Sequence, residues 1–230
     1  MIPRIPINSL RVLHKGQGTL HAVQNGRDTR GPPGIIPDRQ ALRIIAPALV
    51  ADAAILVAGA DDKQILDAVM PGAKERLGIP AGFSIAVIDC HHKRVLGEML
   101  WYVRSFGVPS YVVWSRDVSL VARLRRLSTA AGRDALYHAS EHDRAVRTNK
   151  MLDQSLGGTV LPDSGLCIQE KHACFADGIA GICRRYGPDG TYPDAATCAQ
   201  RMVRKKDGRL DPLIDRAAAM VPPVLEAVAA

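Results

Sequence analysis

Ionisable and nucleophilic side chains follow four short apolar runs in the middle of the chain. Residues 54–58, 84–88, 110–114 and 135–139 each have the length and apolar content of a buried strand. In open α/β sheets, ligands bind outside the carboxyl ends of the strands. We therefore predict a site made from the polar residues that follow these runs, which are Asp61, Asp62, Asp89, Cys90, His91, Ser115, Arg116, Ser140 and Glu141.

The most reactive of these clusters is Asp89-Cys90-His91. Cys90 follows a predicted strand close to a helix start, where the helix dipole could lower its pKa and a neighbouring imidazole could act as a base. We predict Asp89, Cys90, His91 and Glu141 as catalytic residues. The alternative is a helix N-cap followed by solvated histidines.

Asp61, Asp62, Ser115, Arg116 and Ser140 are the predicted ligand-binding residues. Carboxylate oxygens suit hard cations, so the aspartates could bind a divalent cation if the strand order brings their loops together. Asp117, Glu141 and Asp143 would extend that set. Each acidic residue is also explained as a helix N-cap.

A dense group of metal-ligand types occupies the C-terminal third. Its spacing is C-x4-H-x-C-x8-C with one further cysteine, which differs from a zinc knuckle made of two C-x2-C pairs. Four such ligands could hold structural zinc, and the cysteines alone could hold an iron–sulfur cluster. The third interpretation is buried or paired cysteines without a metal. The candidate ligands are Cys167, His172, Cys174, Cys183 and Cys198.

Positive charge predicts a polyanionic partner. The chain carries a formal charge of +7 and has a pI near 9.4, which favours nucleic acid through counterion release. One basic cluster lies on a predicted helix that carries Arg123, Arg125 and Arg126. The other, which we predict to contact nucleic acid, comprises Arg184, Arg185, Arg201, Arg204, Lys205 and Lys206. A solvated charged face is the alternative for both.

Common catalytic signatures are missing from the sequence. Gly16-x-Gly18 lacks the third glycine of a dinucleotide-binding turn, and there is no P-loop, no G-x-S-x-G elbow and no H-E-x-x-H helix. The usual dinucleotide, P-loop, serine-hydrolase and zincin mechanisms are therefore not expected.

The elements that must position these residues alternate along residues 1–158. Residues 9–24 predict a hairpin, and the four strands each lead into a helical segment, among them a helix with Val118, Val121, Leu124 and Leu127 as a buried stripe. Strands and helices in alternation indicate a Rossmann-like, mainly parallel α/β sheet. Residues 159–230 are predicted to form a Cys/His-rich basic module that ends in an amphipathic helix.

Size and composition suit a folded, water-exposed protein. The chain has 230 residues, 47% of them hydrophobic, and no apolar run long enough to span a bilayer. An odd number of cysteines argues against a disulfide framework. We expect a cytoplasmic protein with no membrane partner.

Together these patterns predict a nucleic-acid-binding protein with a structural metal module, which could also process nucleic acid at the strand ends. A second hypothesis is a small-molecule or nucleotide-dependent enzyme with its site at those ends. The third is a noncatalytic interaction module.

Overall fold

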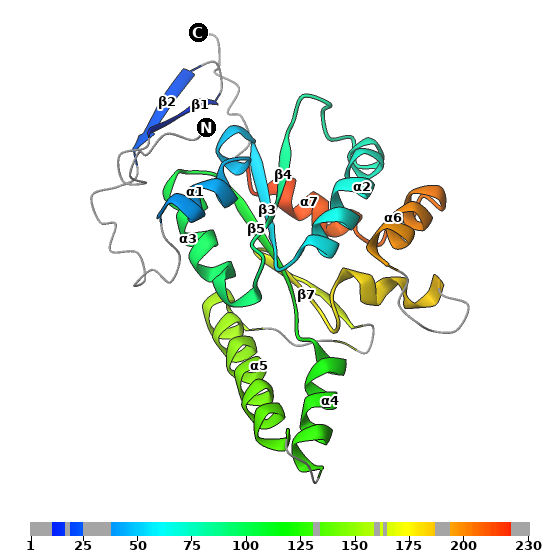
Figure 1. The fold of residues 1–230 in the computed structure, drawn as a ribbon. Coiled ribbons are helices and arrows are strands. Elements are labelled where there is room, and N and C mark those ends of the chain that lie inside the picture. The colour runs from blue at the N-terminus through cyan, green and yellow to red at the C-terminus, as the bar shows by residue number, and fades with distance from the viewer. Residues whose placement is uncertain are drawn as a thin grey trace.

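The computed structural model describes residues 11–16, 19–24, 38–130, 134–158, 162, 165–186 and 194–221. Within these ranges the protein is an α/β fold with a five-stranded, mostly parallel sheet and seven α-helices (Figure 1). The predicted α/β class is confirmed.

The sheet places the strands in the order β4-β3-β5-β7-β6. The first four are parallel, and β6 is an antiparallel edge strand. Their bounds are β3 (Ala53–Val57), β4 (Ile85–Asp89), β5 (Ser110–Ser115), β6 (Leu166–Ile168) and β7 (His172–Phe175). Three of the four predicted strands are thus confirmed, within a residue or two at each end.

Both faces of the sheet are covered, which explains why β3 and β5 are apolar throughout rather than alternating. One face packs against α1 (Asp38–Ile45), α3 (Leu96–Ser105) and the C-terminal part of α5 (Ala135–Leu156). The other packs against α2 (Ala60–Arg76), α6 (Ala195–Arg204) and α7 (Asp211–Ala219).

The predicted strand at 135–139 is wrong, because these residues form the first turns of α5. Leu136 and Tyr137 are 85% and 63% exposed, so this apolar run is not a buried segment. The fourth parallel strand is instead β7, four buried residues that include His172 and Cys174. β7 is short and contains Cys and His, so a search of the sequence for apolar runs does not detect it.

Residues predicted as a separate C-terminal module contribute directly to this sheet. β6, β7, α6 and α7 all come from beyond residue 158, and Phe175, Cys198 and Ile214 share one apolar core with Ile55 and Val113 of the central strands. The structure shows no Cys/His-rich metal module among the residues it describes.

α4 (Val118–Thr129) and α5 pack side by side and extend away from the sheet as a helical hairpin (Figure 1). None of the α4 residues, all of which are described, is buried. The predicted buried stripe is therefore wrong: Val118 and Leu127 are 48% and 40% exposed. The reason is that α4 packs against α5 rather than against the sheet.

The N-terminal hairpin is confirmed, with β1 (Arg11–Gly16) antiparallel to β2 (Thr19–Gln24). No helix in the described part of the chain is both long enough and apolar enough to cross a membrane.

Candidate functional site

The strand order creates a switch point between β3 and β5. From β3 the chain passes through α2 to β4 on one side, and then through α3 back across β3 to β5 on the other. α2 and α3 lie on opposite faces of the sheet. The loops after β3 and β5 therefore diverge, and such a point is where doubly wound sheets bind ligands.

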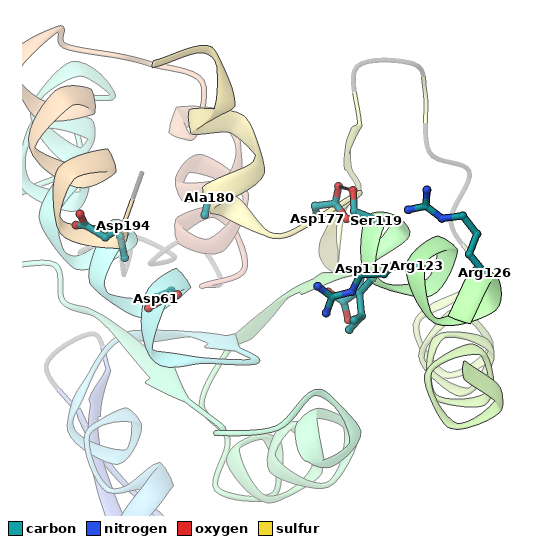
Figure 2. A pocket seen from close by; sticks show the side chains of 10 residues that line it. Asp61, Asp117, Ser119, Arg123, Arg126, Asp177, Ala180 and Asp194 are labelled. Carbon is teal, nitrogen blue, oxygen red and sulfur yellow. Dashed lines mark hydrogen bonds between the residues drawn. The ribbon is translucent and has the colours of Figure 1, made fainter. Parts of the chain in front are cut away.

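A cleft of about 680 Å³ opens at this end of the sheet. Asp61 and Asp194 lie on one side of it, and the residues of α4 with Asp177 lie on the other (Figure 2). The lining combines carboxylates and guanidinium groups: Asp61, Asp117, Ser119, Leu120, Arg123, Arg126, Asp177, Ala180, Asp194 and Ala195.

Helix capping does not account for Asp61, Asp62 and Asp117. The N-cap of α2 is Gly59, which leaves Asp61 and Asp62 inside the first turn. Asp117 is the N-cap of α4, but its side chain makes no capping hydrogen bond and its backbone is left-handed, with φ of 51°. Carboxylates in a first turn do interact favourably with the helix dipole. The carboxylates of Asp61, Asp62 and Asp117 nevertheless make no capping hydrogen bond at the start of their own helices, so capping does not explain why they lie there.

Asp117 is held by a basic residue from another strand end. Lys93 Nζ lies 2.5 Å from Asp117 Oδ2 and also donates to the Ser115 carbonyl at 2.9 Å and to Asn149 Oδ1 at 2.8 Å. The Ser115 hydroxyl donates to Asp117 Oδ1. One lysine therefore ties the segment after β4 to the end of β5 and to α5.

Asp177, which follows β7, is one of the cleft residues that the sequence did not predict; Asp194 is another. The Asp177 carboxylate accepts from the Ser119 backbone N–H and from the Ser119 hydroxyl, both at 2.7 Å. Asp177 thus caps α4 from a different strand. It follows the same rule as the other carboxylates, a polar residue just after a strand, but that signal was hidden because β7 was not recognised.

Asp62, in the first turn of α2, is hydrogen-bonded to the segment that follows β7. Its Oδ1 accepts from the Ile179 N–H at 2.9 Å, which ties α2 to the segment after β7. Burial raises the pKa of Asp62 to about 6, with smaller contributions from the negative charges of Asp61, Asp117 and Asp89. Those contributions show that carboxylates from three strand ends share one electrostatic environment.

We expect Asp62→Asn to raise the free energy of unfolding at pH 7.5, in metal-free buffer, by about 1–3 kcal/mol. Folding raises the pKa of Asp62 from 3.8 to about 6, so the folded state binds this proton more tightly and stability falls as pH rises between those values. Asparagine keeps the acceptor for Ile179 and carries no charge. Denaturant unfolding measured across pH checks this: the two proteins should converge near pH 4, and equal stability at pH 7.5 would contradict the prediction.

The three residues of the Asp89-Cys90-His91 cluster have different surroundings in the structure. The Asp89 carboxylate accepts from the His91 N–H at 2.7 Å and contacts its Nδ1 at 3.1 Å. Cys90 is 1% exposed and points into the core, and burial raises the pKa of its thiol. In this environment Cys90 is a core residue with a protonated thiol, and Asp89 is the member whose charge contributes to the raised pKa of Asp62.

Of the remaining predicted strand-end residues, two lie beside the cleft and two do not. Ser115 precedes Asp117 and bonds to it, and Arg116 Nη2 contacts both oxygens of Asp153 at 2.9 and 2.8 Å. Ser140 and Glu141 lie on α5, where Glu141 pairs with Arg144 at 2.9 Å. Glu141 is not among the residues that line the cleft.

The Cys/His ligand set is also divided. Cys167 and Cys174 are free thiols that lie opposite each other on β6 and β7, while Cys198 is disulfide-bonded and lies on the buried face of α6. Burial lowers the pKa of His172 and raises that of Cys174 to about 12. The side chain of Cys183 lies outside the described part. Among the described residues, no three His, Cys, Asp or Glu side chains are arranged to hold a metal ion, and zinc or an iron–sulfur cluster stays a prediction.

The two basic clusters differ in their relation to the cleft. Arg123 and Arg126 line it, whereas Arg201, Arg204, Lys205 and Lys206 lie at the opposite end of α6 from Asp194. Arg204 lies ten residues along the helix from Asp194, a rise of about 15 Å. Basic residues in a last turn also complement the helix dipole. The side chains of Arg184 and Arg185 lie outside the described part.

No protein-family model matches the chain, and no curated protein sequence matches it.

Proposed function

We propose that the cleft binds nucleic acid through its phosphates together with a divalent cation, and that the protein hydrolyses a phosphodiester bond there. The observation that carries this proposal is the pairing of strand-end carboxylates with Arg123 and Arg126 in one cleft at the switch point. Carboxylates attract the cation, and guanidinium groups bind phosphate oxygens.

The arginines favour an extended phosphate backbone over an isolated anion. Arg123, Arg125 and Arg126 are exposed on α4, and α5 adds Arg144, Arg147 and Lys150 on the projecting hairpin. A strand bound in the cleft could therefore continue along the hairpin. The overall charge of +7 supports the same class of ligand.

The carboxylates support a magnesium-type cation. Mg²⁺ is usually held by one or two carboxylates, with water and substrate phosphates completing its shell. Asp61 lines the cleft and forms no ion pair with any residue that the structure describes, whereas Asp117 is neutralised by Lys93 and Asp177 caps α4. Asp61 is thus the leading cation ligand. Asp61 would hold the cation, which would activate water for hydrolysis of the phosphodiester, while Arg123 and Arg126 would bind the phosphate oxygens.

Asp61→Asn tests the cation role. We expect it to abolish Mg²⁺-dependent hydrolysis of a labelled oligonucleotide and to remove the Mg²⁺-dependent part of binding, with little change in the melting temperature. Asp67→Asn is the matched control, because Asp67 lies on the same helix, is half-exposed and pairs only with Lys63 in the described contacts. If the two variants bind Mg²⁺ and oligonucleotide equally well, Asp61 is not a cation ligand.

The second candidate is a nucleotide-dependent enzyme. It is favoured by the cleft volume of about 680 Å³, which lies in the range typical of small-molecule sites. Competition separates the two: a mononucleotide triphosphate that displaces a labelled oligonucleotide at equal phosphate concentration would favour the small ligand. An oligonucleotide that binds far more tightly favours nucleic acid.

We also propose a cytoplasmic location. Cys90, Cys167 and Cys174 are free thiols, as a reducing compartment would keep them, although the disulfide at Cys198 is the less usual state there.

A further inference from the structure

Two free cysteines face each other across the edge of the sheet. Cys167 on β6 is the antiparallel partner of Cys174 on β7, and directly opposed residues project to the same face. Cys174 is buried, while Cys167 is partly exposed. Neither residue belongs to the cleft.

The register fixes the spacing between them. The Gln169 N–H donates to the His172 carbonyl at 2.9 Å, and the Ala176 N–H donates to the Gly165 carbonyl at 2.7 Å. Hydrogen-bonded pairs alternate along an antiparallel ladder, so Cys167 and Cys174, midway between those two, form a hydrogen-bonded pair. Such pairs have Cα atoms about 5.5 Å apart, which lies inside the Cα range of a disulfide, whereas their Cβ atoms, about 5 to 5.5 Å apart, must approach to about 4.5 Å for the bond to form.

We propose that Cys167 and Cys174 form a reversible disulfide with each other. The oxidant is a small-molecule disulfide such as oxidised glutathione. The Cys167 thiolate attacks the reagent, forms a mixed disulfide and releases one thiol. Cys174, whose thiol is protonated in its buried position, loses that proton as its sulfur attacks the Cys167 sulfur, and the second thiol is released. The two cysteines lose two protons and two electrons, and the reagent is reduced to two thiols.

The position of this pair gives the reaction a structural consequence. The Cys174 sulfur is hydrogen-bonded by Arg116, which directly precedes Asp117 of the cleft and is held by both oxygens of Asp153. Disulfide formation removes the thiol that interacts with Arg116. It also ties the outermost strand covalently to β7, three residues before Asp177.

Thiol counting tests the proposal on the whole protein. Purified protein is equilibrated with oxidised glutathione, quenched with acid, denatured and titrated for free thiols. We expect loss of the two thiols at 167 and 174, recovery of both with dithiothreitol, and retention of Cys90. Cys167→Ser and Cys174→Ala should each abolish the paired loss, whereas Cys90→Ala should leave it intact.

Trypsin offers a direct readout of the bond, because Lys171 lies between the two cysteines. Digestion without reductant should therefore leave their peptides joined, and they should separate on reduction. The proposal is overturned if the peptides are never joined, if glutathione remains on Cys167, or if metal analysis finds zinc that protects both thiols.

Discussion

Replacing Lys93 with methionine is expected to lower the free energy of unfolding by about 2–3 kcal/mol. The side chain is only 13% exposed and contacts Asp117, the Ser115 carbonyl and Asn149. Methionine fills a similar volume but leaves the Asp117 carboxylate without its cation and two acceptors without their donor. Chemical denaturation at pH 7 measures the loss.

Lys63→Met is the matched control for this variant. Lys63 also pairs with an aspartate at 2.5 Å, but its side chain is 40% exposed and its partner, Asp67, is 48% exposed. Exposed pairs on one helix contribute about 0.5 kcal/mol or less. A Lys93→Met loss no larger than that of Lys63→Met would show that Lys93 does not organise the strand ends.

Charge reversal of both cleft arginines is expected to have the largest effect on binding. Arg123→Glu combined with Arg126→Glu should weaken oligonucleotide binding about 10- to 100-fold at 50 mM salt. It should also flatten the slope of log K against log salt by about 2, one unit for each lost phosphate contact. Fluorescence anisotropy over a salt series gives both quantities.

Arg125→Glu is the control on the same helix, because Arg125 is exposed but does not line the cleft. Its effect should be smaller than that of either cleft arginine reversed alone. A third variant tests the competing hypothesis, in which nucleic acid binds at the end of α6. It reverses the charges of Arg204, Lys205 and Lys206. If that triple variant loses binding and the cleft variant does not, nucleic acid binds at the end of α6.

The sequence predicted the central units of the fold because their signals are local. β3, β4 and β5 are apolar runs that lead into amphipathic helices, and the turns after α2 and α3 are marked by Gly78 and Gly107, both with positive φ. Burial on both faces makes such strands continuous apolar runs, which a sequence displays directly. The placement of Asp61, Asp62 and Asp117 at strand ends followed from the same pattern.

The projecting hairpin shows where local signals mislead. Residues 135–139 are apolar enough for a buried strand, and α4 carries an apolar stripe suited to a core, yet none of these side chains is buried. Apolar content measures what a segment can bury. Whether it is buried depends on which surface lies opposite, and for α4 that surface is α5.

Amino-acid sequence by itself determined that this is an α/β protein with acidic residues after its parallel strands. Tertiary structure alone decided which of those residues meet. The order β4-β3-β5-β7 gathers Asp61, Asp117 and Asp177 around one cleft, while α5 carries Glu141 away on the hairpin. It also brought β7 from the C-terminal third beside β5, and so set Cys174 opposite Cys167 instead of leaving both in a separate module. Strand pairing over long sequence separations is specified by the packing of the whole core, which no local window of residues records.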